Sequence, residues 1–416
     1  MDYFDLNLNL TDEDIDLKKA AHKFAKEVMR PVARQLDTMS AEEAVAEGSP
    51  VWDFLKKAYE LGYHSILLPA EAGGPGLTPL QIHLVYEELG WGSFGLAVLL
   101  GVCSFPFYMA ARTALITGDN GLVEKFVKPF CMCRDGSMRG CWAITEPDHG
   151  SDISGKGQEF FTDPNVRYNL QAVLNGDDWV LNGQKSAWVS NGVLATHAVL
   201  FAGVDPSMGL AGGGIFFCPL EIDGVSKGKA LDKIGQRDLN QGEIYFDNAR
   251  IPKNYLLFGP EVYVPMLDAT VAGANTCMGI FATGLARAAF EEAFKYAKER
   301  VQGGKTIIEH TSVKQRLFDM FARVEACRAL SRAVSNFNMS TVMPVLEYSM
   351  ASKTRCTQMA FENAHEAVQL LGGNGLTREY LTEKFFRDAR ASLIEDGCNE
   401  MLAAEGGHIL SETYPR

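Results

Sequence analysis

Short apolar stretches separated by turn-forming pairs occupy the middle of the chain, and this feature most limits the folds open to it. Four of these stretches, at residues 179–181, 197–201, 214–217 and 243–246, have the composition of β-strands. Pairs that favour tight turns punctuate them: Asn175-Gly176, Asn182-Gly183, Asn191-Gly192 and Asp223-Gly224. Residues 138–252 are therefore predicted to form an antiparallel β domain.

Both flanks of this region show the periodicity of helices instead. Thr11 can cap a helix whose first turn carries carboxylates, and an apolar stripe with helical spacing follows it. Further helical stretches are expected at 52–61, 78–89, 122–130, 282–300, 313–334, 350–371 and 390–410. The predicted fold class is α+β, with an N-terminal helical domain (1–137), the β domain (138–252) and a C-terminal helical bundle (253–416).

Charge and composition exclude several classes of protein. The 416 residues include 39 Lys and Arg against 52 Asp and Glu, a net charge of −13, which argues against binding nucleic acid. The apolar run at 96–102 is too short to span a bilayer, and the acidic N-terminus lacks the features of a signal peptide. The nine cysteines, including Cys131, Cys133 and Cys141, lack the spacing of a zinc site. We expect a cytoplasmic protein with reduced thiols, no membrane insertion and no metal.

Four segments combine glycine, hydroxyl and basic or amide residues in a fixed order along the chain. Each segment alone could be a loop, a hairpin or a helix end. They are Cys-Trp-Ala-Ile-Thr-Glu-Pro followed by Gly-Ser-Asp (141–152), Asn-Gly-Gln-Lys-Ser-Ala-Trp-Val-Ser (182–190), Arg-Val-Gln-Gly-Gly-Lys (300–305) and Gln-Leu-Leu-Gly-Gly (369–373). Together, in a helix–β–helix frame, they resemble the acyl-CoA dehydrogenase family.

The resemblance implies a flavoprotein that binds FAD and a CoA thioester. In the first segment it assigns Trp142, Ile144, Thr145, Gly150 and Ser151 to the cofactor, with Thr145 bonding the isoalloxazine and Ser151 also near the CoA pantetheine. In the second, Trp188 would pack on the flavin and Ser190 would donate toward its N5–O4 edge. One extra residue separates Lys185 from Trp188, compared with the family pattern.

The third and fourth segments resemble those that reach the FAD of a neighbouring subunit in this family. Arg300 would bind the pyrophosphate, because a guanidinium fork matches phosphate oxygens. The resemblance also assigns to the cofactor the residues Gln302, Thr311, Gln369, Gly372, Gly373, Cys398 and Glu400. It implies a homo-oligomer, a dimer of dimers, and an electron-transfer flavoprotein as electron acceptor.

The family's reaction removes a proton from Cα of an acyl-CoA and transfers a hydride from Cβ to flavin N5. Its usual base is a Glu followed by Gly-Thr, eight residues after the Asp of Arg-Asp. In this chain the residue eight positions after Asp388 is Asp396, and Gly397 and Cys398 follow it. Asp396 is therefore the expected catalytic base, and Glu395 is the alternative. Some relatives carry the base elsewhere, but the matching position is Ala274, followed by Asn275 where Arg is usual.

The shorter carboxylate suggests an unusual substrate. Asp lacks one methylene of Glu, so its carboxylate retreats by about 1.5 Å and leaves room beside a cyclic or α-branched Cα. The uncharged helix at 93–101 would line the acyl pocket and predicts a neutral acyl group, with cyclohexanecarboxyl-CoA as the leading candidate. The expected substrate-binding residues are Ser151, Leu96, Ala97, Leu100, Asn275 and Gly397. The alternatives are altered chemistry (a lyase or an enoyl-CoA reductase) and a catalytically silent flavoprotein that serves as a binding module.

Overall fold

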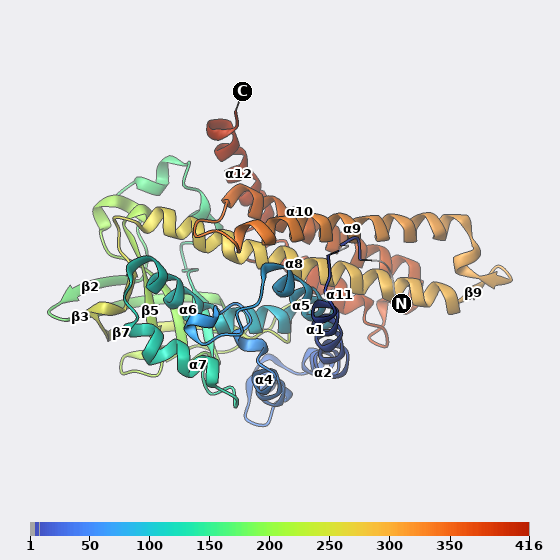
Figure 1. Cartoon of the computed structure of the whole chain (residues 1–416), viewed down its shortest axis with the longest axis horizontal. Coiled ribbons are helices and arrows are strands. Elements are labelled where there is room, and N and C mark those ends of the chain that lie inside the picture. The colour runs from blue at the N-terminus through green and yellow to red at the C-terminus, as the bar shows by residue number, and fades with distance from the viewer. Residues whose placement is uncertain (1–4, 8, 416) are drawn as a thin grey trace.

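The computed structural model describes residues 5–7 and 9–415. Figure 1 shows a group of N-terminal helices, a β-sheet on one side of the molecule, and a bundle of long C-terminal helices that extends away from the sheet. The predicted α+β class, with its helix–β–helix order, is confirmed.

The N-terminal part is helical, as predicted. Its helices are α1 (Asp12–Phe24), continued by a π-helical turn, α2 (Arg30–Thr38), α3 (Ala41–Val45), α4 (Pro50–Glu60), α5 (Pro79–Gly92), α6 (Phe94–Thr117) and α7 (Lys128–Met132). The predicted cap is present: Thr11 Oγ1 accepts from the Asp14 amide at 3.2 Å, and the Asp14 carboxylate accepts from the Thr11 amide at 3.0 Å. At α6, the Ser93 hydroxyl accepts from the Leu96 amide at 3.3 Å and fixes where this helix begins.

Eight strands form the central sheet: β1 (Gly140–Ala143), β2 (Gln171–Asn175), β3 (Asp178–Ser190), β4 (His197–Gly203), β5 (Gly213–Pro219), β6 (Val225–Lys227), β7 (Gln241–Pro252) and β8 (Leu256–Phe258). Their order is β6-β7-β3-β2-β4-β5-β8, with β1 paired to β4. Most pairs are antiparallel, as predicted, but β1 runs parallel to β4, and β2 meets β4 in parallel. The sheet is therefore mixed. A long connection separates β1 from β2, so the two strands do not form a hairpin. The sheet also continues past residue 252, through β8.

One of the predicted turns is a strand irregularity instead. Asn182-Gly183 lies inside β3, where the pairing with β7 shifts register between Leu181 and Gly183. Gly183 has φ of 130°, and a Cβ there would lie 2.5 Å from the Asn169 carbonyl oxygen. Only glycine fits this approach, so the pair marks a bulge rather than a turn.

The C-terminal bundle contains α8 (Tyr263–Glu299), the hairpin β9 (Val301–Gln302) and β10 (Lys305–Thr306), α9 (Thr311–Asn338), α10 (Leu346–Leu371), α11 (Thr382–Ser392) and α12 (Asn399–Thr413). The α8 helix packs against α5, α9 and α10. The single helical stretch predicted at 390–410 is wrong. The α11 helix ends at Ser392 and α12 begins at Asn399; no α-helix could continue through Asp396 (φ 53°) and Gly397 (φ 92°), which take left-handed conformations.

Two helices, α6 and α8, are long and apolar enough to cross a membrane by length and composition alone. The most apolar windows of the two are 83% and 89% buried inside the fold, as is usual for core helices of globular proteins. Their burial supports the expectation that neither helix inserts into a membrane.

Candidate functional site

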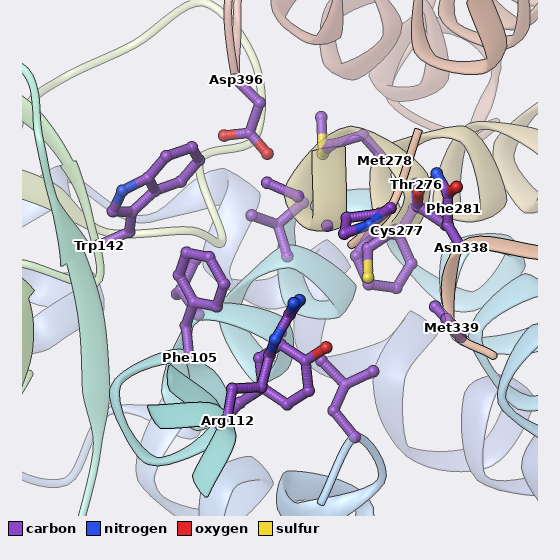
Figure 2. A pocket seen from close by; sticks show the side chains of 18 residues that line it. Phe105, Arg112, Trp142, Thr276, Cys277, Met278, Phe281, Asn338, Met339 and Asp396 are labelled. Atoms are coloured by element: carbon purple, nitrogen blue, oxygen red, sulfur yellow. Dashed lines mark hydrogen bonds between the residues drawn. The ribbon is translucent and has the colours of Figure 1, made fainter. Parts of the chain in front are cut away.

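A pocket lies where the three parts of the chain meet. Figure 2 shows its side chains, which come from the α4–α5 connection, α6, β1, α8, the end of α9 with the α9–α10 connection, and the turn between α11 and α12. Most of the lining is apolar, and its charged members are Arg112 and Asp396. The lining residues from the C-terminal bundle are Gly273, Ala274, Thr276, Cys277, Met278, Phe281, Asn338, Met339, Pro344 and Asp396.

The α6 helix forms one wall of this pocket, with a different face from the one predicted. Leu96, Ala97 and Leu100 are buried in the core but do not line the pocket. Each residue turns a helix by about 100°, so neighbouring positions face a different surface. The wall is formed instead by Val98, Gly101, Val102, Phe105, Tyr108 and Arg112.

Arg112 changes the predicted character of the pocket. The expectation of a neutral acyl group depended on an uncharged helix at 93–101, and that stretch is uncharged. However, Arg112 extends from the same helix, three turns further along, into the pocket lining. The stretch 93–101 is uncharged as expected, but the pocket as a whole contains a cation, so the uncharged stretch does not by itself indicate a neutral acyl group.

Asp396 lies in the turn between α11 and α12 and points into the pocket (Figure 2). Burial raises the pKa of its carboxyl to about 7; the neighbouring Glu395 carboxylate adds to the rise, and the Lys353 ammonium opposes it. A carboxylate with a pKa near neutrality is suited to accept a proton from carbon, because general bases work best near the operating pH.

Glu395 faces away from the pocket lining. Its Oε2 accepts from the Gln236 side-chain amide at 2.8 Å. That amide belongs to a buried polar network in which Lys384 contacts Asp388 at 2.7 Å and Asp238 at 3.2 Å. Of the two candidate bases, the structure thus places Asp396, and not Glu395, in the pocket.

Three side chains from different elements hold the turn that carries Asp396. The Asn275 side-chain amide donates to the Asp396 carbonyl oxygen at 2.9 Å, and Lys353 Nζ donates to the Gly397 carbonyl oxygen at 2.7 Å. The Ser151 hydroxyl accepts from the Cys398 amide at 2.9 Å. Three consecutive residues are therefore fixed from α8, α10 and the loop after β1, which restricts the position of the Asp396 carboxylate.

Four residues with predicted binding roles are part of this arrangement or make its contacts. Asn275, Ser151, Gly397 and Cys398 all contribute to the turn that carries Asp396, and none of them lines the pocket. Lys353 was not predicted. The sequence offered one indication of it, a lone basic residue on the face of α10 that is buried. Burial lowers the pKa of Lys353 to about 8, and the Asp396 carboxylate opposes this shift.

The first predicted cofactor segment runs along the pocket edge. Trp142 on β1 lines the pocket and packs edge-on against Phe105, with 5.3 Å between the ring centroids. Its indole N–H is buried and has no hydrogen-bond partner among the described residues. The Ile144 carbonyl oxygen accepts from Lys185 at 3.1 Å, and the Thr145 carbonyl oxygen accepts from the Ser186 amide at 2.9 Å. Gly150 is exposed at the surface.

A buried ion pair joins this segment to the second one. Lys185 Nζ lies 2.6 Å from Glu146 Oε1, and both side chains are fully buried. Burial lowers the pKa of Lys185, and Glu146 opposes the change. The Glu146 carboxylate also accepts from the backbone amides of Asn169 and Leu170. The pair therefore holds the loop after β1 against β3.

The extra residue before Trp188 is absorbed by a second bulge. Between Lys185 and Val189, β3 advances four positions while β7 advances two, from Ile244 to Gly242. Trp188 lies in this bulge with 57% of its surface exposed. Ser190 closes the strand, and its hydroxyl accepts from the Gln241 side chain at 3.0 Å.

These residues fit a flavin. The unpartnered N–H of Trp142 and the open indole face of Trp188 provide what a planar, hydrogen-bonding ring system needs on a protein surface. The described residues contain no cluster of three or more His, Cys, Asp or Glu side chains that could hold a metal ion.

Most of the remaining predicted cofactor residues lie away from this pocket; Glu400 is the exception, four residues after Asp396 in the first turn of α12. Arg300 ends α8, 19 residues after the pocket residue Phe281, which corresponds to about 28 Å along the helix. Figure 1 shows the β9 hairpin that follows it at the far end of the bundle. Arg300 cannot reach the pocket of its own chain. All of the following are exposed: Arg300, Gln302, Thr311, Gln369, Gly372, Gly373 and Glu400.

Comparison with known proteins identifies the family. Models of the acyl-CoA dehydrogenase N-terminal, middle and C-terminal domains match residues 11–127, 141–249 and 269–407. The chain is 30% identical to the mitochondrial short-chain specific acyl-CoA dehydrogenase of Rattus norvegicus, over 95% of this chain and 89% of the relative.

Two solved structures extend the match to three dimensions. Butyryl-CoA dehydrogenase from Megasphaera elsdenii is 27% identical, with a TM-score of 0.83, over 98% of this chain and 100% of that one. A chain in a structure of the electron transferring flavoprotein of Acidaminococcus fermentans is also 27% identical, with a TM-score of 0.83, over 97% and 99% of the two chains. The protein therefore belongs to the acyl-CoA dehydrogenase family of FAD-dependent oxidoreductases.

Proposed function

We propose that the protein dehydrogenates the Cα–Cβ bond of a cyclic or α-branched acyl-CoA thioester, with FAD as cofactor and Asp396 as base. The observation that carries this proposal is the Asp396 carboxylate, which points into a mostly apolar pocket and has a pKa raised to about 7. Trp142, Thr145, Trp188 and Ser190 would hold the flavin. FAD supplies a hydride acceptor when it is bound.

The chain's own residues supply the proton-transfer half of the reaction. Asp396 accepts the Cα proton, and the contacts from Asn275, Lys353 and Ser151 keep its peptide from shifting as the charge moves. The apolar walls around Phe105, Met278 and Phe281 exclude water, which keeps the free carboxylate basic enough to act.

The substrate preference follows from the length of the base. The Asp396 carboxylate stops about 1.5 Å short of a glutamate at the same position. A ring or branch at Cα would fill this space, whereas a straight chain would leave a gap that costs rate. Cyclohexanecarboxyl-CoA remains the leading candidate for the carbon skeleton.

Anaerobic titration of the flavin absorbance with CoA thioesters tests this function. We expect kcat/KM to be higher for cyclohexanecarboxyl-CoA and isobutyryl-CoA than for butyryl-CoA, by about tenfold or more. In Asp396→Glu the preference should move toward butyryl-CoA, because the longer side chain restores reach but occupies the space beside Cα. A wild-type preference for butyryl-CoA would remove the steric argument, and a flavin that no thioester bleaches would remove the proposed activity.

We also propose that the protein is a dimer of dimers in which each FAD contacts two chains. Arg300, Gln302 and Gln369 are exposed and lie away from their own pocket, which supports a contact with another subunit's cofactor. Large apolar side chains near the same end of the bundle as Arg300 are exposed as well: Val301 by 57% on β9, and Phe318 by 67% near the start of α9. An electron-transfer flavoprotein as acceptor and a cytoplasmic location are further proposals, which follow from the family and the composition.

Analytical ultracentrifugation and flavin content test the assembly. Phe318→Glu should break the tetramer and lower the FAD content per chain, because it places a charge in an apolar interface. Val173→Glu is a matched control, since Val173 is 62% exposed but lies on β2, away from the bundle. A wild-type monomer that retains one FAD per chain would contradict the proposal.

A further inference from the structure

Arg112 carries a charge that has no acidic partner among the described residues. It is the only charged residue in the 24-residue apolar helix α6, and it lines the pocket half-buried. Its Nη2 donates to the Val342 carbonyl oxygen, but it forms no salt bridge with an acidic side chain in residues 5–7 or 9–415. A guanidinium has five N–H donors in a fixed fork, so most of its hydrogen-bonding capacity is unused.

The position of Arg112 relative to the base is suited to a substrate with two ends. Figure 2 shows Asp396 and Arg112 on opposite sides of the pocket. Phe105, which packs on Trp142 at the flavin side, lies seven residues before Arg112, or about 10 Å along the helix. Tyr108 lies one turn before Arg112, and the guanidinium carbon is 5.8 Å from the centre of its ring. A phenol hydroxyl and a guanidinium thus line the same end of the pocket.

We propose that the acyl group carries a carboxylate on the side remote from the thioester, and that Arg112, assisted by Tyr108, binds it. This inference rests on the proposed dehydrogenase function and names the substrate class more closely. A cation in a mostly apolar cavity gains most from an anion, because water competes weakly there and a carboxylate matches the guanidinium fork. Because Arg112 lies across the pocket from Asp396 (Figure 2), a six-membered ring with substituents at both ends, or a dicarboxylic chain, would direct its second carboxylate toward the guanidinium.

A purely structural role for Arg112 is the rival explanation. Its bond to Val342 anchors the α9–α10 connection, whose Met339 and Pro344 also line the pocket. An anchor would affect stability and all substrates alike. A carboxylate site would affect only those substrates that carry the second charge, so a ratio between two matched substrates separates the two roles.

The matched probes are trans-4-carboxycyclohexanecarboxyl-CoA and trans-4-methylcyclohexanecarboxyl-CoA, used with the FAD-loaded enzyme. We expect wild-type kcat/KM to favour the carboxylate by about tenfold to a hundredfold, the usual effect of hydrogen bonds to a charged group. Arg112→Met should reverse the preference, since the carboxylate would then enter an apolar pocket without a partner. Arg112→Lys should keep part of it, and Tyr108→Phe should reduce it a few-fold. Arg250→Met, a change of an exposed arginine on β7, is the control and should leave the ratio unchanged.

Several results would overturn the inference. A wild-type preference for the methyl probe would overturn it. This comparison needs no variant, so the test remains decisive even if Arg112→Met fails to fold. An equal fall for both probes in Arg112→Met, with a lower melting temperature, would assign Arg112 to the anchor role. If neither probe nor any other thioester bleaches the flavin, the proposed dehydrogenase function fails instead, and the two failures are thereby distinguished.

Discussion

Replacing Asp396 with Asn should slow substrate-dependent flavin reduction by about 10²–10⁴-fold, the usual cost of removing a positioned base. Asparagine keeps the shape of the side chain and tolerates the left-handed backbone found at this position (φ 53°). The contacts from Asn275, Lys353 and Ser151 go to backbone atoms of residues 396–398, so they remain in the variant. FAD and thioester binding should therefore persist, and anaerobic stopped-flow absorbance would isolate the loss to the chemical step.

The pH dependence of the same reaction provides an independent check. The pKa of Asp396 is raised to about 7 by burial, so the carboxyl holds its proton at lower pH and cannot accept another. The wild-type rate should rise as the pH passes through 7 and level off above it. The residual rate of Asp396→Asn should lack this step. Glu395→Gln is the control, because Glu395 bonds Gln236 outside the pocket lining; a slow Glu395→Gln beside a normal Asp396→Asn would make Glu395 the base.

The pocket carboxylate that we propose as the base could be picked out from the sequence, because its position depends on a short, ungapped interval. Asp388 and Asp396 are eight residues apart, and both lie in or directly after one helix, so counting was enough. The pocket wall could not be found in this way. Leu96, Ala97 and Leu100 differ from Val98, Gly101 and Phe105 only in helical phase, and α6 is apolar all round, so its sequence contains no signal for phase. The single charged residue of α6, Arg112, was the one indication in the sequence of which helix face lines the pocket.

The turn between α11 and α12 shows a second limit of sequence analysis. The apolar pattern continues through residues 390–410, and the two left-handed residues, Asp396 and Gly397, interrupt it. Lys353 and Asn275 stabilise this turn from positions 44 and 121 residues before the carbonyl groups that they bond. Contacts of such separation depend on how α8 and α10 pack, which a single sequence does not reveal. For the same reason, the parallel pairing of β1 with β4 was missed.

The buried pair of Glu146 and Lys185 is the second place where one substitution should have a large effect. Glu146→Gln removes the counter-charge of a fully buried ammonium 2.6 Å away, and an uncompensated buried charge typically costs about 3–5 kcal/mol. We expect this loss in the free energy of unfolding, measured by urea denaturation at fixed protein and FAD concentrations. The loop after β1 carries Thr145 and is fixed to β3 through this pair, so the FAD affinity should fall as well.

The double variant Glu146→Gln/Lys185→Met separates the charge from the packing. With both charges absent, the Gln oxygen can still accept from the Leu170 amide, and Met fills the space of the lysine stem, so most of the stability should return. In Glu146→Gln alone, the deficit should shrink as the pH rises. The pKa of Lys185 is lowered in the folded state, so the unfolded state binds more protons and stability increases with pH. A deficit that neither Lys185→Met nor higher pH relieves would show that Glu146 acts through its bonds to the Asn169 and Leu170 amides, and not through the ion pair.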